Sequence, residues 1–246
     1  MVKIKHLERA PIVEAVIDIR VRLPIDFKIK EKLSTLRKEL SEKYNKVEKR
    51  TVITGSIKVE DGKPVVKEEE KEGIKGYRFT SRDKKEVAQF RKDGFTFSRL
   101  KPYTNWDKVF EEAKRLWELY KLEFSPQVIE RISTQYINRI DIKNKSDLEE
   151  YFTASPKLPK TLPQVLSLFF TRLLVEDKDL QVSITQANVP SSKPEHVGII
   201  LDIEVFKENE KGLDESKIWS TFGRMRQLKN RVFFKLIKEK TERMFE

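Results

Sequence analysis

The chain has 246 residues, of which 38% are hydrophobic and 15 are Phe, enough for a substantial core in one large domain or in two of roughly 120 residues. It contains no cysteine, which excludes disulfides, thiolate metal ligands and cysteine nucleophiles. The net charge of +11 is uneven, because Lys and Arg outnumber Asp and Glu by 31 to 22 in residues 1–126 but by only 20 to 18 in residues 127–246.

The distribution of apolar residues indicates a cytoplasmic protein with no membrane partner. No apolar run approaches the roughly 18 to 20 residues needed to span a bilayer, and the start of the chain lacks the apolar centre of a signal peptide. Charged residues make up 37% of the chain and are mostly Lys and Glu, a composition typical of hyperthermophile proteins.

The first half reads as a strand, a helix, an antiparallel meander and a second helix. Apolar and polar residues alternate through APIVEAVIDIRVRLP, which predicts a strand ended by Pro24. Asp26 is a plausible N-cap for a helix whose apolar positions recur from Ile29 to Val47. Short strands follow between residues 50 and 100, and the highly charged 63–73 is expected to form a mobile hairpin tip or loop.

Three more helices are predicted from apolar spacing and capping residues. Residues 106–120 carry the most strongly amphipathic pattern, WDKVFEEAKRLWELY, and its aromatic stripe should pack on the meander. Asp214 caps a long terminal helix that extends nearly to the C-terminus. A short helix is expected near residues 146–151, with Ser146 as its N-cap.

The strands of the second half begin with a polar segment at residues 128–142. Asn138 falls on its more apolar face, which predicts a bulge or a buried hydrogen-bond network near Tyr136 to Arg139. The segment VLSLFFTRLLVED is ambiguous between a buried strand and a short helix. Residues 180–190 and 197–207 are predicted strands.

Both halves thus have the order strand, helix, antiparallel strands, long helix. This order predicts an α+β fold of two similar modules, 1–126 and 127–246, with helices packed on curved antiparallel sheets, which could form one continuous pseudo-duplicated domain. By analogy of element order, the topology resembles TATA-binding-protein-like folds and helix-grip folds. Fold alone does not imply function.

Three segments carry a family resemblance: APIVEAVIDIRV, the helix WDKVFEEAKRLWELY, and RISTQYINRIDI followed by the proline-rich YFTASPKLPKTLP. Together they resemble a sporadically distributed prokaryotic protein family with no established activity, over nearly the whole chain. The resemblance implies a cytoplasmic prokaryotic protein and transfers no catalytic residue. The sporadic distribution hints at mobile or defence-related genes.

Common catalytic and cofactor motifs are missing. The sequence has no GxxxxGK[ST], GxGxxG, HExxH or GxSxG, and its two SxxK tetrads, which start at Ser81 and Ser98, come without the SDN and KTG motifs of lactamase-type serine enzymes. Nucleotide-hydrolase, Rossmann, zincin and serine-hydrolase chemistry therefore have no support, and no cofactor is expected. The best enzymatic signal is a set of strand carboxylates that could hold a divalent cation for phosphodiester hydrolysis. An alternating, solvated strand face explains the same pattern. The carboxylates are Asp141, Asp202 and Glu204.

Basic residues of the terminal helix are the candidate binding residues. Lys217, Arg224 and Arg231 share one helix face with other lysines, and such a stripe could follow nucleic-acid phosphates. Arg226 and Lys229 instead fall on the apolar arc, which predicts either a polar network or ligand groove against the second sheet, or stems that reach out to solvent.

The groove hypothesis assigns a role to one more residue. Arg139 and Asp141 share one face of the strand 128–142, and we expect Arg226 and Lys229 to point toward that face, so Arg139 is the preferred site residue. Asn138, on the opposite face, is interpreted as structural.

The favoured function is a binding or adaptor protein, non-enzymatic by default, with nucleic acid as the partner class. The alternatives are a metal-dependent phosphodiesterase and a protein-interaction subunit of a defence or mobile-element system, with a protein partner or a homodimer.

Overall fold

A computed structural model describes residues 7–60, 63–103, 105–143, 148–159, 161–162 and 167–246, with the backbone alone for 52–72. Over these residues the chain forms one antiparallel sheet in the order β2-β3-β4-β5-β1-β6-β9-β8-β7. The strands are β1 (Ile12–Arg22), β2 (Tyr44–Glu60), β3 (Lys63–Ser81), β4 (Glu86–Arg91), β5 (Gly94–Leu100), β6 (Val128–Ile142), β7 (Phe170–Asp177), β8 (Leu180–Pro190) and β9 (Val197–Glu208).

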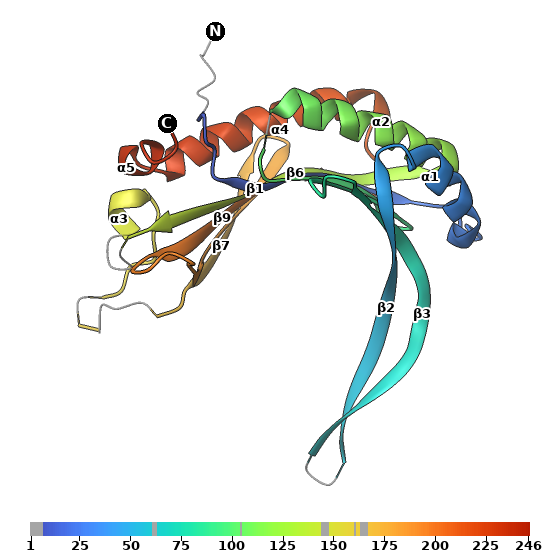
Figure 1. The fold of residues 1–246 in the computed structure, drawn as a ribbon, viewed down its shortest axis with the longest axis horizontal. Helices are drawn as coiled ribbons and strands as arrows, with labels where there is room; N and C mark the ends of the chain where they lie inside the picture. The colour runs from blue at the N-terminus through green and yellow to red at the C-terminus, as the bar shows by residue number, and fades with distance from the viewer. Residues whose placement is uncertain (1–6, 61–62, 104, 144–147, 160, 163–166) are drawn as a thin grey trace.

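Two long helices cover one face of this sheet (Figure 1). The helical elements are the 3-10 turn η1 (Ile29–Lys32), α1 (Leu33–Leu40), α2 (Trp106–Phe124), α3 (Leu148–Tyr151), α4 (Glu215–Leu236) and α5 (Glu239–Glu242). In Figure 1 the sheet bends away from α2 and α4 toward both of its ends, and the β2–β3 ribbon projects from one end. The protein is therefore an α+β fold with helices on a curved antiparallel sheet, as the sequence predicts.

The sheet joins the two halves of the chain at its centre. Residues 1–126 supply β1 to β5 and α2, whereas 127–246 supply β6 to β9 and α4. β1 and β6 pair antiparallel along most of their length, with Ile17 opposite Thr134. The sheet is continuous across the proposed boundary, and the independence of the two modules, like the analogy with TATA-binding-protein and helix-grip folds, stays a prediction.

The aromatic stripe of α2 packs on the meander as its spacing predicts. The Asn105 side chain accepts a hydrogen bond from the backbone N–H of Lys108 and so caps the helix. The ring centroid of Tyr120 lies 6.2 Å from that of Phe90 on β4 and 6.1 Å from that of Phe95 on β5. Edge-on and offset ring contacts of this kind add to the burial of apolar area. This packing fixes α2 over the first half of the sheet.

Several predicted boundaries are wrong. The first helix ends at Leu40, and Tyr44 and Val47 belong to β2, because pairing with β3 overrides their helical spacing. Asp26 is not the cap, since the helical segment begins after Lys28. Residues 63–73, predicted as a tip or loop, are part of β3 and pair with β2.

Elements of the second half are partly as predicted. The Asp214 side chain accepts from the backbone N–H of Ser216 and caps α4, but the helix ends at Leu236 instead of near the C-terminus. The ambiguous segment is a strand, β7, from Phe170, and it lies exposed at the sheet edge. The predicted cap Ser146 lies outside the described residues.

Candidate functional site

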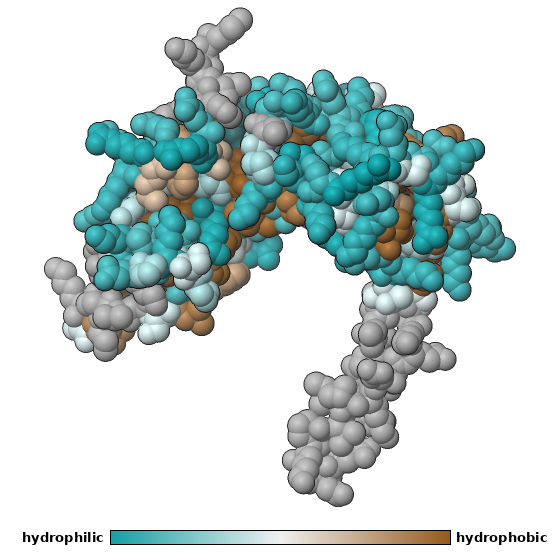
Figure 2. Space-filling model, in the orientation of Figure 1, coloured by the Kyte–Doolittle hydropathy of each residue, from teal (hydrophilic) through white to brown (hydrophobic). Residues whose placement is uncertain are grey.

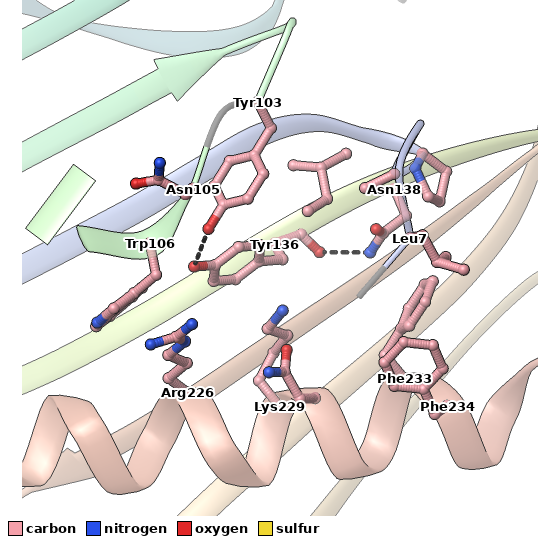
Figure 3. A pocket seen from close by; sticks show the side chains of 14 residues that line it. Leu7, Tyr103, Asn105, Trp106, Tyr136, Asn138, Arg226, Lys229, Phe233 and Phe234 are labelled. Carbon is pink, nitrogen blue, oxygen red and sulfur yellow. Dashed lines mark hydrogen bonds between the residues drawn. The ribbon is translucent and has the colours of Figure 1, made fainter. Parts of the chain in front are cut away.

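A pocket lies between α4 and the central strand β6, close to the first turn of α2. Its volume is about 100 Å³. In Figure 3 side chains of α4 point toward Tyr136 of β6, and the segment that leads into α2 closes one side. The lining residues differ in origin but are mostly aromatic, amide or cationic, and include Leu7, Tyr103, Asn105, Trp106, Tyr136, Asn138, Arg226, Lys229, Asn230, Phe233 and Phe234.

Lys229 is the most unusual of these residues. It is only 7% exposed, and its Nζ lies 3.7 Å from the centroid of the Tyr136 ring. Burial, together with the nearby positive charge of Arg226, lowers the pKa of Lys229 from 10.5 to about 7. An ammonium taken out of water favours its neutral form. Lys229 can therefore exchange a proton near neutral pH.

Two tyrosine hydroxyls lie beside this lysine. The oxygens of Tyr103 and Tyr136 are 3.4 Å apart and share a hydrogen bond. Burial raises the pKa of both phenols above 10, that of Tyr136 most strongly. The two groups therefore stay protonated across the physiological range. One hydroxyl proton is left to donate to a ligand.

Asn138 forms the opposite side of the pocket. Its side-chain amide donates to the backbone oxygens of Tyr136, at 3.2 Å, and of Leu201, at 3.0 Å. The pairing of β1 with β6 shifts register between Ile12 and Glu14, directly opposite this position. Both the bulge and the buried hydrogen bonds predicted near Tyr136 to Arg139 are confirmed. Asn138 is structural, and it also lines the pocket.

Arg226 stands at the outer edge of the pocket. Its side chain is 30% exposed and its guanidinium lies 3.8 Å from the carboxylate of Asp107, which is itself 79% exposed. The guanidinium also lies 5.6 Å from the centroid of the Trp106 ring. An exposed ion pair of this length holds weakly. The positive charge of Arg226 is thus available to a ligand in the pocket.

The predicted partnership between these cations and Arg139 is wrong. α4 packs on the face of β6 that carries Tyr136 and Asn138, and because strand side chains alternate, Arg139 points to the opposite face. There it donates to the backbone oxygen of Pro190 at 2.7 Å and to Asp141 at 3.3 Å. The alternative that Lys229 reaches solvent is also wrong, since it is buried.

The carboxylates of the phosphodiesterase hypothesis do not form a cluster. Gln135 donates to Asp202 at 2.7 Å, and Arg131 donates to Glu204 at 2.8 Å. Asp141 sits opposite Gly198, four residues along β9 from Asp202, or about 13 Å at the usual strand rise. Burial raises the pKa of Asp202. Among the described residues no group of three His, Cys, Asp or Glu could hold a metal ion.

The predicted basic stripe on α4 is largely paired with acids. Arg224 binds Asp179 through two hydrogen bonds of 2.6 and 2.8 Å, and Arg231 binds Asp177. The pair with Arg224, together with Lys207, holds the pKa of Asp179 below its usual range. Lys217 lies 3.0 Å from Asp214. Nucleic-acid binding through this stripe stays a prediction.

The sequence identified Arg226, Lys229 and the buried Asn138 but missed several of the residues around them. Leu7 and Tyr103 reach the pocket from segments distant in sequence, and no spacing rule links them to α4. The sequence predicts a helix from Trp106, but gives no sign that this end of the helix faces α4.

Comparisons with known proteins add no identity. A scan against protein-family models and a search of the curated proteins both found no match. No helix in the described part of the chain is long and apolar enough to cross a membrane. The cytoplasmic location expected from the sequence stays a prediction.

Proposed function

We propose that the protein binds a small organic carboxylate in the pocket between α4 and β6. The observation that carries this proposal is a buried lysine, Lys229, in a pocket whose described lining contains no Asp or Glu. A buried charge without a counter-ion is costly. A carboxylate ligand would supply the missing negative charge.

Further charges around the pocket support an anion. Arg226 stands at its edge, 3.8 Å from an exposed carboxylate. Asn105 caps α2 and lines the pocket, so the N-terminal end of that helix, with its partial positive charge, lies close by. The Tyr103 and Tyr136 hydroxyls add a hydrogen-bond donor for the second carboxylate oxygen.

The size and walls of the pocket limit the ligand. A cavity of about 100 Å³ is somewhat smaller than the engineered cavities of ~150 Å³ that accept benzene. Phe233 and Trp106 make apolar walls on two sides. The proposal therefore favours a ligand with a short apolar group and a single carboxylate, and excludes a nucleotide or a peptide as the enclosed part.

Isothermal titration with a panel of small acids tests the proposal. Acetate, propionate, pyruvate and benzoate are compared at pH 6 with their amides, which keep the shape and lose the charge. We expect at least one acid to bind, its amide to bind at least about tenfold more weakly, and Lys229→Met to abolish binding. Lys235→Met is the matched control, because Lys235 is an exposed lysine on the same helix.

Two outcomes would overturn the proposal. One is equal binding of acids and amides, which would make the pocket an apolar site. The other is binding that survives in Lys229→Met with unchanged affinity, because the acid would then be held somewhere else.

A further inference from the structure

β7 is an edge strand whose large apolar side chains are exposed. Within the described part of the chain it ends the sheet and pairs with β8 alone. Four of its side chains are among the most exposed large hydrophobic residues of the described chain, namely Phe170 at 68%, Leu173 at 53%, Leu174 at 62% and Val175 at 43%. In Figure 2 brown, hydrophobic surface lies at the lower left, at the end of the sheet where Figure 1 places β7. An exposed apolar edge strand is a template for pairing with another chain.

The opposite edge of the sheet is protected in the ordinary way. On β2 the side chains of Lys46, Glu48, Lys49 and Arg50 carry charges, and charged side chains are a common device that prevents edge pairing. β7 instead has three consecutive apolar residues at its centre, Leu173, Leu174 and Val175, between the charged Arg172 and Glu176. The contrast between the two edges points to a partner at β7 alone.

Backbone geometry determines which groups of β7 face outward. β7 and β8 are joined by the two residues Lys178 and Asp179, and their pairing starts at Asp177 opposite Leu180. In such a hairpin the residues that flank the turn exchange hydrogen bonds, and every second residue does the same. The odd-numbered residues of β7 therefore bond to β8, so the N–H and C=O of Arg172, Leu174 and Glu176 point to the free edge.

We propose that a second copy of this chain pairs antiparallel with β7, about a two-fold axis at Leu174. This register places Leu174 opposite itself, Arg172 opposite Glu176 of the second copy, and Leu173 opposite Val175. The residues at the axis are those with outward backbone groups, so the hydrogen-bond pattern of the sheet continues across the interface. The two sheets would join into one of eighteen strands, twice the nine of one chain.

Charge complementarity identifies the occupant as a second copy. Each interface would contain two Arg172–Glu176 pairs on the same sheet face, and opposite charges facing each other across an antiparallel pair are stabilising. Arg172 donates through Nε to Ser183 at 3.0 Å, which orients the guanidinium and leaves its other N–H groups for a carboxylate. The strand is thus complementary to itself in both charge and apolar pattern.

β7 is also held in place for such pairing. Asp177 binds Arg231 of α4, and Asp179, in the turn, binds Arg224 of the same helix. These bonds attach the end of the hairpin to the helix layer. A fixed edge loses little conformational entropy on pairing, which favours association.

Charge exchange tests the register. Sedimentation velocity at about 50 µM protein compares the wild type with Arg172→Glu, Glu176→Arg and the double exchange. We expect the wild type to be a dimer. Each single variant should have a dissociation constant at least about tenfold larger, because two attractive pairs become two repulsive ones. The double variant should regain the wild-type dissociation constant. Circular dichroism confirms that each variant is folded, because all of these side chains lie at the sheet edge.

A cross-link gives an independent readout. The chain has no native cysteine, and Leu174→Cys would bring two thiols together across the axis, at a Cα separation of about 5.5 Å that a disulfide can bridge. Leu122→Cys, at an exposed position on α2, is the control. Rapid disulfide dimers with Leu174→Cys and none with Leu122→Cys support the proposal. A monomeric wild type, single variants that dimerise normally, or a double variant that does not recover would each overturn it.

Discussion

Replacing Lys229 with methionine should change the pH dependence of stability between pH 6 and pH 10. Methionine keeps the unbranched shape and loses the charge, so it fills the space beside Tyr136 without a buried ammonium. The wild-type chain must instead bury that ammonium at 7% exposure whenever the pH is below about 7. We therefore expect Lys229→Met to be the more stable protein at pH 6.

The magnitude follows from the pKa of Lys229. A fall from 10.5 to about 7 corresponds to at most about 5 kcal/mol, at 1.36 kcal/mol for each pKa unit. The Tyr136 ring, 3.7 Å from Nζ, attracts the ammonium by up to about 2 kcal/mol when both are desolvated. The expected gain in the free energy of unfolding at pH 6 is therefore roughly 3 to 5 kcal/mol.

The direction with pH is equally definite. Between pH 7 and 10 the unfolded chain keeps its proton on Lys229 while the folded chain has lost it, so the unfolded state binds more protons and wild-type stability rises with pH. Below pH 7 both states are protonated and the full cost of burial remains. The advantage of Lys229→Met should thus shrink steadily toward pH 10.

Urea unfolding at a series of pH values, followed by tryptophan fluorescence, measures this difference directly. Taking the difference between variant and wild type removes the contributions of all other titrating groups. Lys235→Met serves as the control and should run parallel to the wild type. Parallel curves for Lys229→Met as well would refute the reasoning, because Lys229 would then titrate in the folded protein as it does in the unfolded one.

Three further predictions concern other parts of the molecule. Burial raises the pKa of Glu112, but hydrogen bonds from Arg115 and Tyr44 outweigh burial and lower the pKa to about 2. Glu112→Gln should therefore lower the free energy of unfolding at pH 7 by about 2 to 3 kcal/mol. This loss should vanish as the pH falls from 4.5 toward 2, because the wild-type carboxylate then becomes protonated. If the basic residues of α4 bind nucleic-acid phosphates, Asp179→Asn should release Arg224 and tighten binding, whereas alanine at Lys217, Arg224 and Arg231 should weaken binding and reduce its salt dependence. Fluorescence anisotropy with labelled nucleic acid measures both effects. No response in either variant would contradict nucleic-acid binding through this helix face. Mn²⁺ should leave the thermal unfolding midpoint unchanged and should support no phosphodiester cleavage. Mn²⁺-dependent cleavage that is lost on alanine substitution of Asp141, Asp202 and Glu204 would instead support a metal site at these carboxylates.

Periodicity and capping residues were sufficient to predict the α+β fold. The apolar spacing of α2 and the alternation in β1 are local patterns, and they survive because burial of one face decides each element. The cap at Asp214 was readable for the same reason. The first helix was overextended because Tyr44 and Val47 continue its helical spacing, whereas in the structure that segment pairs with β3 as a strand.

The site was predicted only in part, because strand alternation shows which residues share a face but not which face a helix covers. Helical periodicity predicts that Arg226 and Lys229 lie on the apolar, buried side of α4, and burial is confirmed for Lys229. The prediction of which face of β6 they contact was wrong, because Asn138 and not Arg139 lines the pocket with them. The apolar β7 read as a buried strand or a helix, because a sequence does not show that a strand lies at an edge.

Proton uptake on ligand binding tests the central claim most directly. A carboxylate in the pocket would stabilise the ammonium form of Lys229, which is mostly neutral at pH 8 in the free protein. Titration calorimetry of the tightest-binding acid at pH 8, in two buffers of different ionisation enthalpy, counts the protons taken up. The proposal predicts close to one proton per ligand in the wild type and in Lys235→Met. Binding with no proton uptake would contradict it.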